Sequence, residues 1–152
     1  KRGWEVLGTG LGALRWKRFP DDGEARAPVP PLLRIWDEDA RVLLQTRPEA
    51  SLDRLFLMFP DPWPKARHTK RRFVHPGNLP VVARALKLGA VWRVASDDPT
   101  YQVWVEEVMG AQEFFTTAPP ALERPEGWPP TRYEAKAIRV GRQPMYWTFV
   151  RK

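Results

Sequence analysis

The sequence has 152 residues, the size of one ordinary domain, and a hydrophobic share of 43% that suffices for a folded core. It carries 25 lysines and arginines against 18 aspartates and glutamates, for a net charge of +7, and it has no cysteine. The lack of cysteine excludes disulfides, zinc–thiolate sites and thiol nucleophiles, and we expect no metal site. No apolar run reaches the ~18 residues of a membrane span and no signal segment opens the sequence. A soluble, cytoplasmic protein is therefore predicted.

The first 31 residues carry weak structural signals. A short strand is expected over residues 4–7, followed by the spaced glycines of Gly8-Thr-Gly10-Leu-Gly12 and by a proline-rich stretch at 27–31. We therefore divide the chain into an irregular N-terminal segment, 1–31, and a folded domain, 32–152.

From residue 32 onward the apolar spacing predicts alternating strands and helices. The expected strands cover 32–36, 55–59, 90–95, 113–117 and 145–150, and the expected helices cover 39–45, 78–88 and 98–109. Gly89 is placed to end the second helix as a C-terminal cap, and Asp98 to begin the third as its N-cap. This order predicts an α/β fold with a mostly parallel sheet and an antiparallel edge added by the C-terminal residues.

The excess positive charge lies in one short segment. Residues 65–72 read Lys-Ala-Arg-His-Thr-Lys-Arg-Arg, which places five positive side chains and a histidine together without an acid. A patch this dense is a candidate phosphate-binding site, because each neutralised phosphate releases condensed counterions. The alternative is a solvated loop that contacts nothing.

Acids follow three successive predicted strands. Asp37-Glu38-Asp39 comes after the first, Pro60-Asp61-Pro62-Trp63-Pro64 after the second, and Ser96-Asp97-Asp98 after the third. Because open α/β sheets bind ligands beyond the carboxyl ends of their strands, a site is predicted at this edge. The alternating prolines stiffen the middle loop, which favours fixed orientations for Asp61 and Trp63. The alternative is a purely structural turn with Trp63 in the core.

The segment Phe59-Pro-Asp-Pro-Trp-Pro-Lys-Ala-Arg-His-Thr-Lys-Arg-Arg72 closely resembles the signature of the bacterial tRNA (guanine-N7)-methyltransferases. The similarity continues in Ser51-Leu-Asp-Arg54, Ala95-Ser-Asp97 and Thr131-Arg-Tyr-Glu-Ala-Lys136, so it covers about residues 32–152. It implies a Rossmann-like class I methyltransferase sheet that uses S-adenosyl-L-methionine. The implied substrate is a guanine in the variable loop of tRNA. No membrane partner is expected, and the sequence leaves open whether the protein is a monomer or a homodimer.

The resemblance also implies roles for single residues. Asp39 corresponds to the acid near the adenine end of the cofactor, and Asp61 to the active-site aspartate beside both the cofactor and the target base. The positions that correspond to substrate binding are Lys65, Asp97, Thr131, Arg132, Tyr133 and Glu134, with Arg132 where many members have lysine. The positions that correspond to RNA contact are Arg67, His68, Thr69, Lys70, Arg71 and Arg72. Each has a structural alternative: Asp39 and Asp97 as helix caps, and Thr131 with Glu134 as a capping box.

These residue types suit the implied reaction. Guanine N7 has an in-plane lone pair and no proton, so methyl transfer from a sulfonium needs alignment and a suitable field rather than a general base. A fixed carboxylate such as Asp61 can stabilise the positive charge left on the purine and can accept from the N1–H and amine of guanine. The base has to leave its stack to reach such a pocket, and Trp63 is assigned a supporting role beside it.

The family's first half, with its glycine-rich loop and acid-terminated second strand, is absent or altered in this sequence. Gly8–Gly12 resembles the cofactor loop, but the 26 residues from 13 to 38 are too few for the usual helix, strand and helix. We therefore expect a domain truncated at its N-terminus. Two alternatives to an active enzyme follow: a catalytically silent RNA-binding remnant or subunit, and an α/β domain whose basic loop contacts a protein.

Overall fold

The computed structural model describes residues 6–7, 35–36 and 38–152. The glycines at 8–12 and the proline-rich stretch at 27–31 lie outside the described residues, as does most of the predicted N-terminal segment. In chain order the elements are β1 (Val6–Leu7), β2 (Ile35–Trp36), α1 (Ala40–Thr46), β3 (Leu52–Met58), the 3₁₀ helix η1 (Ala66–Arg71), α2 (Leu79–Ala85), β4 (Leu86–Ser96), α3 (Pro99–Gly110), β5 (Phe115–Thr117), α4 (Arg132–Arg139) and β6 (Met145–Arg151). Within these residues no helix is both long and apolar enough to cross a membrane.

The main sheet has four strands in the order β3-β4-β6-β5, and β1 pairs with β2 in a separate parallel ribbon. β3 and β4 are parallel, and β6 is antiparallel to both of its neighbours, so that β3, β4 and β5 share one direction. The predicted α/β class is confirmed. The antiparallel part that was predicted for the C-terminal residues is also confirmed: β6 pairs antiparallel with β4 and with the short β5, which is the last strand on that side of the sheet.

The interior position of β6 follows from its side chains. Trp147 and Phe149 are each 1% exposed and join Trp92 of β4 in the main apolar core. The ring centroids of Trp92 lie 5.5 Å from Phe115 and 5.7 Å from Phe149. An edge position would leave one side of the β6 backbone unpaired and would expose part of this aromatic cluster, which a central position covers.

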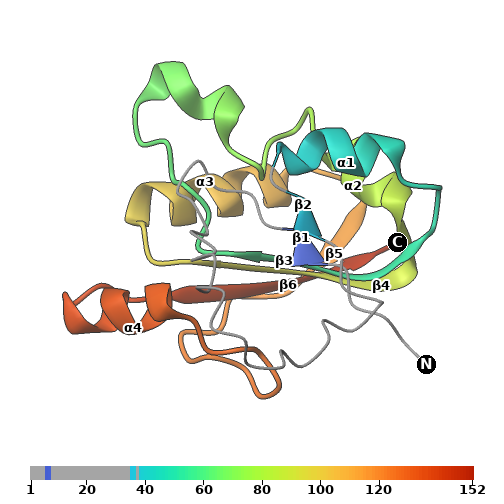
Figure 1. Ribbon diagram of the computed structural model, residues 1–152. Coiled ribbons are helices and arrows are strands. Elements are labelled where there is room, and N and C mark those ends of the chain that lie inside the picture. The colour runs from blue at the N-terminus through green and yellow to red at the C-terminus, as the bar shows by residue number, and fades with distance from the viewer. Residues whose placement is uncertain (1–5, 8–34, 37) are drawn as a thin grey trace, which may run out of the picture.

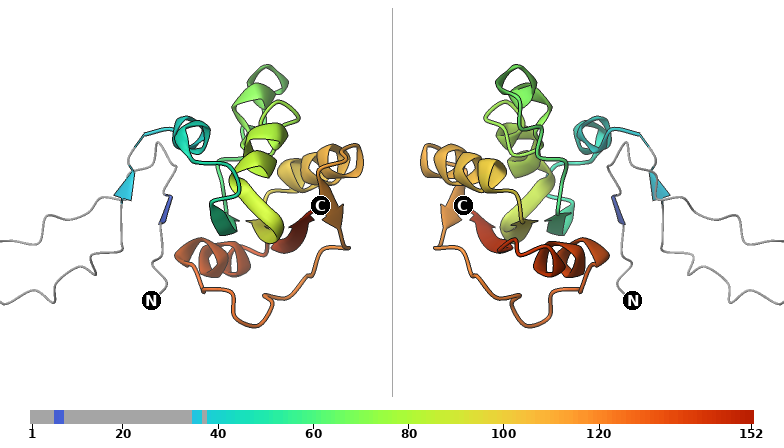
Figure 2. Two further views of the ribbon diagram at one scale, coloured as in Figure 1. Left: turned by 90° about the vertical axis from the view of Figure 1, so that its right-hand side faces the viewer. Right: turned by 90° about the vertical axis from the view of Figure 1, so that its left-hand side faces the viewer.

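Helices α1, α2 and α3 cover one face of the sheet, whereas α4 and the loop before it lie on the other face (Figures 1 and 2). The α1 helix is tied to α2 by the guanidinium of Arg84, whose Nη2 donates to the carbonyls of Leu44 at 3.1 Å and Gln45 at 3.0 Å. Arg84 thus links two of the three helices on that face.

One predicted boundary is wrong. The second predicted helix ends at Ala85 rather than Leu88, and β4 starts directly at Leu86. Gly89 does not cap a helix: it lies inside β4 with φ of +74°, where the pairing shifts from Leu52↔Leu86 to Arg54↔Val91. The extra residues of β4 form a bulge, and a glycine suits the left-handed backbone that the bulge requires.

Candidate functional site

The acid loop, residues 59–65, leaves the carboxyl end of β3 through a backbone that few side chains tolerate. Phe59 has φ of +53° and Trp63 has φ of +42°, both in the left-handed region. The amide of Phe59 donates to the carbonyl of Ala95 at 2.8 Å, which fixes the loop to the end of β4. Asp61, two residues further on, is exposed. A strained, proline-stiffened loop thus presents a carboxylate beyond the sheet.

Trp63 packs on the basic segment and not in the main core. Its indole is half-buried, with the guanidinium of Arg71 4.8 Å from the ring centroid and the His68 ring edge-on at 5.6 Å. The cation over the ring face adds electrostatic attraction to the contact. The alternative in which Trp63 plugs the core is therefore not the arrangement in this structure.

The basic segment folds into η1, which presents its cations unequally. Lys65, Arg67, Lys70 and Arg71 are exposed, and His68 and Thr69 are half-buried. Arg72, directly after η1, is only 3% exposed. Four cations of the predicted patch therefore face solvent, where a phosphate can reach them, and the fifth faces inward.

Arg72 is committed to the acid loop. Its Nε donates to the carbonyl of Pro62 at 2.9 Å and its Nη2 to the carbonyl of Trp63 at 3.1 Å. Its guanidinium also lies 4.9 Å from the ring centroid of Trp104 on α3. This buried charge has its hydrogen bonds and its aromatic face supplied by the protein itself.

Asp39 caps α1 and lies near the basic segment. Its carboxylate accepts from the backbone amide of Arg41 at 2.9 Å and from the Arg41 Nε at 2.8 Å. Nη1 of the same arginine reaches the carbonyl of Lys70 at 3.5 Å. The side-chain hydrogen bond from Arg41 lowers the pKa of the exposed Asp39 carboxyl, which keeps it ionised. Asp39 is thus a helix cap and an exposed, ionised carboxylate whose two oxygens are both paired with Arg41.

Asp97 and the motif 131–134 lie past the end of β4. The half-buried Asp97 pairs with Nη1 of Arg142 at 3.2 Å, and the neighbouring Asp98, not Asp97, caps α3 by accepting from the amide of Tyr101 at 3.0 Å. Thr131 and Glu134 form a capping box on α4. Arg132 and Tyr133 are exposed and stack on one another, with 5.0 Å between guanidinium and ring centroid.

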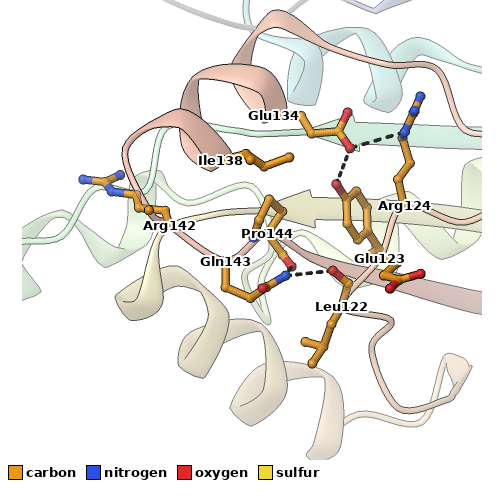
Figure 3. Close-up of a pocket in the computed structure, with 10 residues that line it drawn as sticks. Leu122, Glu123, Arg124, Glu134, Ile138, Arg142, Gln143 and Pro144 are labelled. Atoms are coloured by element: carbon orange, nitrogen blue, oxygen red, sulfur yellow. Dashed lines mark hydrogen bonds and ion pairs between the residues drawn. The ribbon is translucent and has the colours of Figure 1, made fainter.

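The Glu134 carboxylate has further partners beyond the capping box. Its Oε1 accepts from the Tyr146 hydroxyl at 2.6 Å and pairs with Nε of Arg124 at 3.3 Å (Figure 3). Burial, followed by the hydrogen bond to Glu134, raises the pKa of Tyr146, so the phenol stays protonated and donates. The motif at 131–134 therefore has a structural function in this fold, whatever else it does.

These residues border an open cavity of about 480 Å³. Figure 3 shows Glu134 and Arg124 on one side of it and Arg142 and Gln143 on the other. The amide of Gln143 donates to the carbonyl of Leu122 at 2.7 Å and joins the two lining segments. Sequence reasoning missed Arg124, Arg142 and Gln143, because they stand outside any motif and no local pattern marks them.

The acid loop and the segment that carries Asp97 start from the same end of the sheet. Met58↔Ala95 and Ala95↔Tyr146 are paired across three strands, and Phe59 packs on the small cluster of Ala95, Trp128 and Tyr146. The carboxyl ends of β3 and β4 therefore coincide with the start of β6. The acid loop leaves from this end, and so does the segment that carries Asp97.

The fold is that of an α/β protein in which acids follow the carboxyl ends of two parallel strands, the place where open α/β sheets bind their ligands. The chain belongs to the family described as "Putative methyltransferase", whose profile matches residues 31–146. The family predicted from residues 59–72 is thereby confirmed.

Curated relatives agree with this assignment. The chain is 61% identical over 149 residues to a tRNA (guanine-N(7)-)-methyltransferase of Granulibacter bethesdensis, an alignment that covers 97% of this chain and 66% of the relative. It is 53% identical over 124 residues to the enzyme of the same name from Mesorhizobium japonicum, covering 79% of this chain and 53% of that one. The chain thus spans between about half and just under two thirds of the relatives it matches.

Among solved structures, a putative methyltransferase from Haloferax volcanii, determined in complex with the Trm112 methyltransferase activator, matches with a TM-score of 0.47 and 14% identity, over 81% of this chain and 63% of that one. This similarity is too low to bear on function.

Proposed function

We propose that this chain is the catalytic and RNA-contacting part of a tRNA (guanine-N7)-methyltransferase, which transfers a methyl group from S-adenosyl-L-methionine to N7 of a guanine in the tRNA variable loop. The observation that carries the proposal is the 61% identity over 149 residues to a relative of that name, which spans the acid loop and the basic segment. The geometry supports it, because a carboxylate on a stiff loop stands next to exposed cations at the ligand-binding end of the sheet. We also propose that the protein acts in the cytoplasm, as a monomer or homodimer.

The cofactor's requirements fit the described residues. Asp39 is exposed and ionised, and both of its carboxylate oxygens accept from Arg41, so a contact with the exocyclic amine of adenine requires Arg41 to release part of the carboxylate. Asp61 lies on the neighbouring loop, exposed and without a hydrogen bond that would occupy it among the contacts described here. S-adenosyl-L-methionine supplies an electrophilic methyl on a sulfonium. Asp39 would hold its adenine end and Asp61 would face the reacting end.

The chain's own residues supply position and charge in the proposed reaction. Asp61 accepts from the N1–H and amine of the target guanine and stabilises the cationic purine that methylation leaves. No proton has to be removed from N7, so the reaction needs no general base. Trp63, braced by Arg71, forms the wall beside the base once it has left its stack.

The remaining predicted residues divide by exposure. Lys65, Arg67, Lys70 and Arg71 contact the tRNA phosphates, with His68 and Thr69 beside them. Asp97, which is held by Arg142, and the exposed pair Arg132 and Tyr133 contact the substrate. Thr131 and Glu134 act on the substrate only indirectly, by fixing the start of α4.

The test compares the chain with its Asp61→Asn variant. We expect the chain to methylate unmodified tRNA, read out as 7-methylguanosine by nucleoside mass spectrometry. The variant should lose at least about 10-fold in rate, near 1.4 kcal/mol of transition-state stabilisation, with tRNA affinity within about 2-fold of the parent. Equal rates of methyl transfer for the two proteins would refute the proposed catalytic role of Asp61.

The second candidate is a catalytically silent RNA-binding protein, which the four exposed cations of the basic segment would serve equally well. Calorimetric titration with S-adenosyl-L-methionine separates the two. Salt-sensitive tRNA binding without any cofactor heat would support the silent protein, and heat of binding together with methyl transfer would support the enzyme.

A further inference from the structure

The acid loop cannot hold its own shape through ordinary backbone pairing. Pro60, Pro62 and Pro64 have no amide hydrogen, and two other loop residues have positive φ. Left-handed backbone at non-glycine residues costs about 1–3 kcal/mol each and persists only where surrounding contacts enforce it. Something outside the loop must therefore satisfy its carbonyls and fix its path.

Arg72 supplies those contacts from a buried position. One planar guanidinium donates to two successive carbonyls, those of Pro62 at 2.9 Å and Trp63 at 3.1 Å. These carbonyls come directly after Asp61 in the chain, so the clamp fixes the peptide units on its C-terminal side. A lysine at this position could not reproduce the geometry, because an ammonium is a single point donor group without a planar fork.

The clamp is anchored to α3 through Trp104. The Arg72 guanidinium lies 4.9 Å from the centroid of the Trp104 ring, and Nε1 of Trp104 donates to the carbonyl of Val74 at 2.6 Å. The ring of His75 stacks on Trp104 at 6.1 Å with 28° between the planes. Asn78 adds one more contact to this region, because its Nδ2 donates to the carbonyl of Phe73 at 2.9 Å. The end of the basic segment is thus fixed to the helix that follows Asp97.

We infer that Arg72, seated on Trp104, is a positioning residue that aims Asp61 by clamping the acid loop, and that it takes no part in phosphate binding. The inference rests on the proposed function for what Asp61 acts upon, but the clamp itself is independent of it. It divides the basic run 65–72 into exposed cations for RNA and one buried cation for the loop.

The experiment compares Arg72→Lys with two substitutions on the same segment: Lys70→Ala as the control for loop exchange, and Arg71→Ala for the salt dependence below. The first readout is hydrogen exchange, which needs no activity. We expect Arg72→Lys to speed exchange at the amides of Phe59 and His68, which are bonded to Ala95 and Lys65, by at least about 10-fold, with β4 unchanged. Trp104→Leu should act in the same way, and Lys70→Ala should not.

The second readout is the salt dependence of tRNA binding. Each phosphate contact contributes about 0.7–0.9 to the slope of log K against log salt. Arg71→Ala should lower the slope by roughly that amount, whereas Arg72→Lys should leave it unchanged and Arg72→Ala should leave it equally unchanged. A lower slope for Arg72→Ala would overturn the inference, because it would place Arg72 on the phosphate backbone.

The third readout is turnover. Arg72→Lys should lower kcat about 10-fold or more with the KM for tRNA within about 2-fold, and added guanidinium at millimolar concentration should restore part of the rate of Arg72→Ala. Unchanged exchange and unchanged kcat in Arg72→Lys would refute the clamp. If the parent chain transfers no methyl group, the proposed function fails, and the exchange result still decides whether Arg72 holds the loop.

Discussion

Replacement of Tyr146 by phenylalanine tests the buried contact that joins α4 to the sheet. The Tyr146 side chain is 3% exposed, and its hydroxyl lies 2.6 Å from the Glu134 carboxylate. A hydrogen bond to a charged group contributes about 1.5–3 kcal/mol, and its removal leaves the carboxylate with Arg124 as its remaining charged partner. That ion pair is too exposed on the Arg124 side to compensate, because such pairs contribute about 0–1 kcal/mol.

We therefore expect Tyr146→Phe to lower the free energy of unfolding by about 2 kcal/mol. With a urea m-value near 2 kcal/mol per molar, the denaturation midpoint falls by about 1 M at unchanged m. The measurement is urea unfolding followed by circular dichroism. Tyr133→Phe is the matched control: that ring is 46% exposed and its hydroxyl accepts from Arg132 at 3.2 Å, so a change under about 0.5 kcal/mol is expected.

Equal stabilities for the two variants would refute the reasoning, since it rests on the burial of one hydroxyl and the exposure of the other. A Tyr146→Phe variant more stable than the parent would also refute it. In that case the hydroxyl would be a net cost, and the Glu134 carboxylate would be sufficiently satisfied by the capping box and Arg124.

Two further changes probe other parts of the fold. Arg41 lowers the pKa of Asp39 below its ordinary value of 3.8, so the charged pair stabilises the fold above that pH, and this stabilisation is lost as the pH falls through the lowered value. The melting temperatures of the parent and of Asp39→Asn should therefore converge in acid and separate toward neutral pH. A difference in melting temperature that stays constant with pH would contradict this. Gly89→Ala should lower the free energy of unfolding, measured in urea, by about 1 kcal/mol, because the φ of +74° is strained for alanine even though no atom lies within 4 Å of the added Cβ. The control is Gly110→Ala in α3, where the Cβ also meets open space but φ is ordinary; this change should leave the stability unchanged or raise it slightly.

Much of the fold follows from local signals in the sequence. Asp98 and Pro99 open α3, and Thr131 with Glu134 opens α4, because capping depends on residues three or four apart. The boundary of α2 could not be predicted in this way. Gly89 has the residue type of a helix C-cap, but the pairing of Leu52 with Leu86 draws the chain into β4 before a further helical turn can form.

The sequence by itself determined the family, the alternation of strands and helices, and the loop on which Asp61 stands, since all of these depend on residue types at short spacing. Only the tertiary structure decided which cations of the run 65–72 are available. Nothing in the sequence distinguishes Arg71 from Arg72. In the fold, the guanidinium of Arg72 is buried against Trp104 of α3, a helix that begins 27 residues after Arg72. Tertiary structure likewise decided the partners of Glu134 and Asp97. Tyr146 and Arg142 reach these acids only because β6 enters the sheet beside β4, and such long-range pairing leaves no mark in the local sequence.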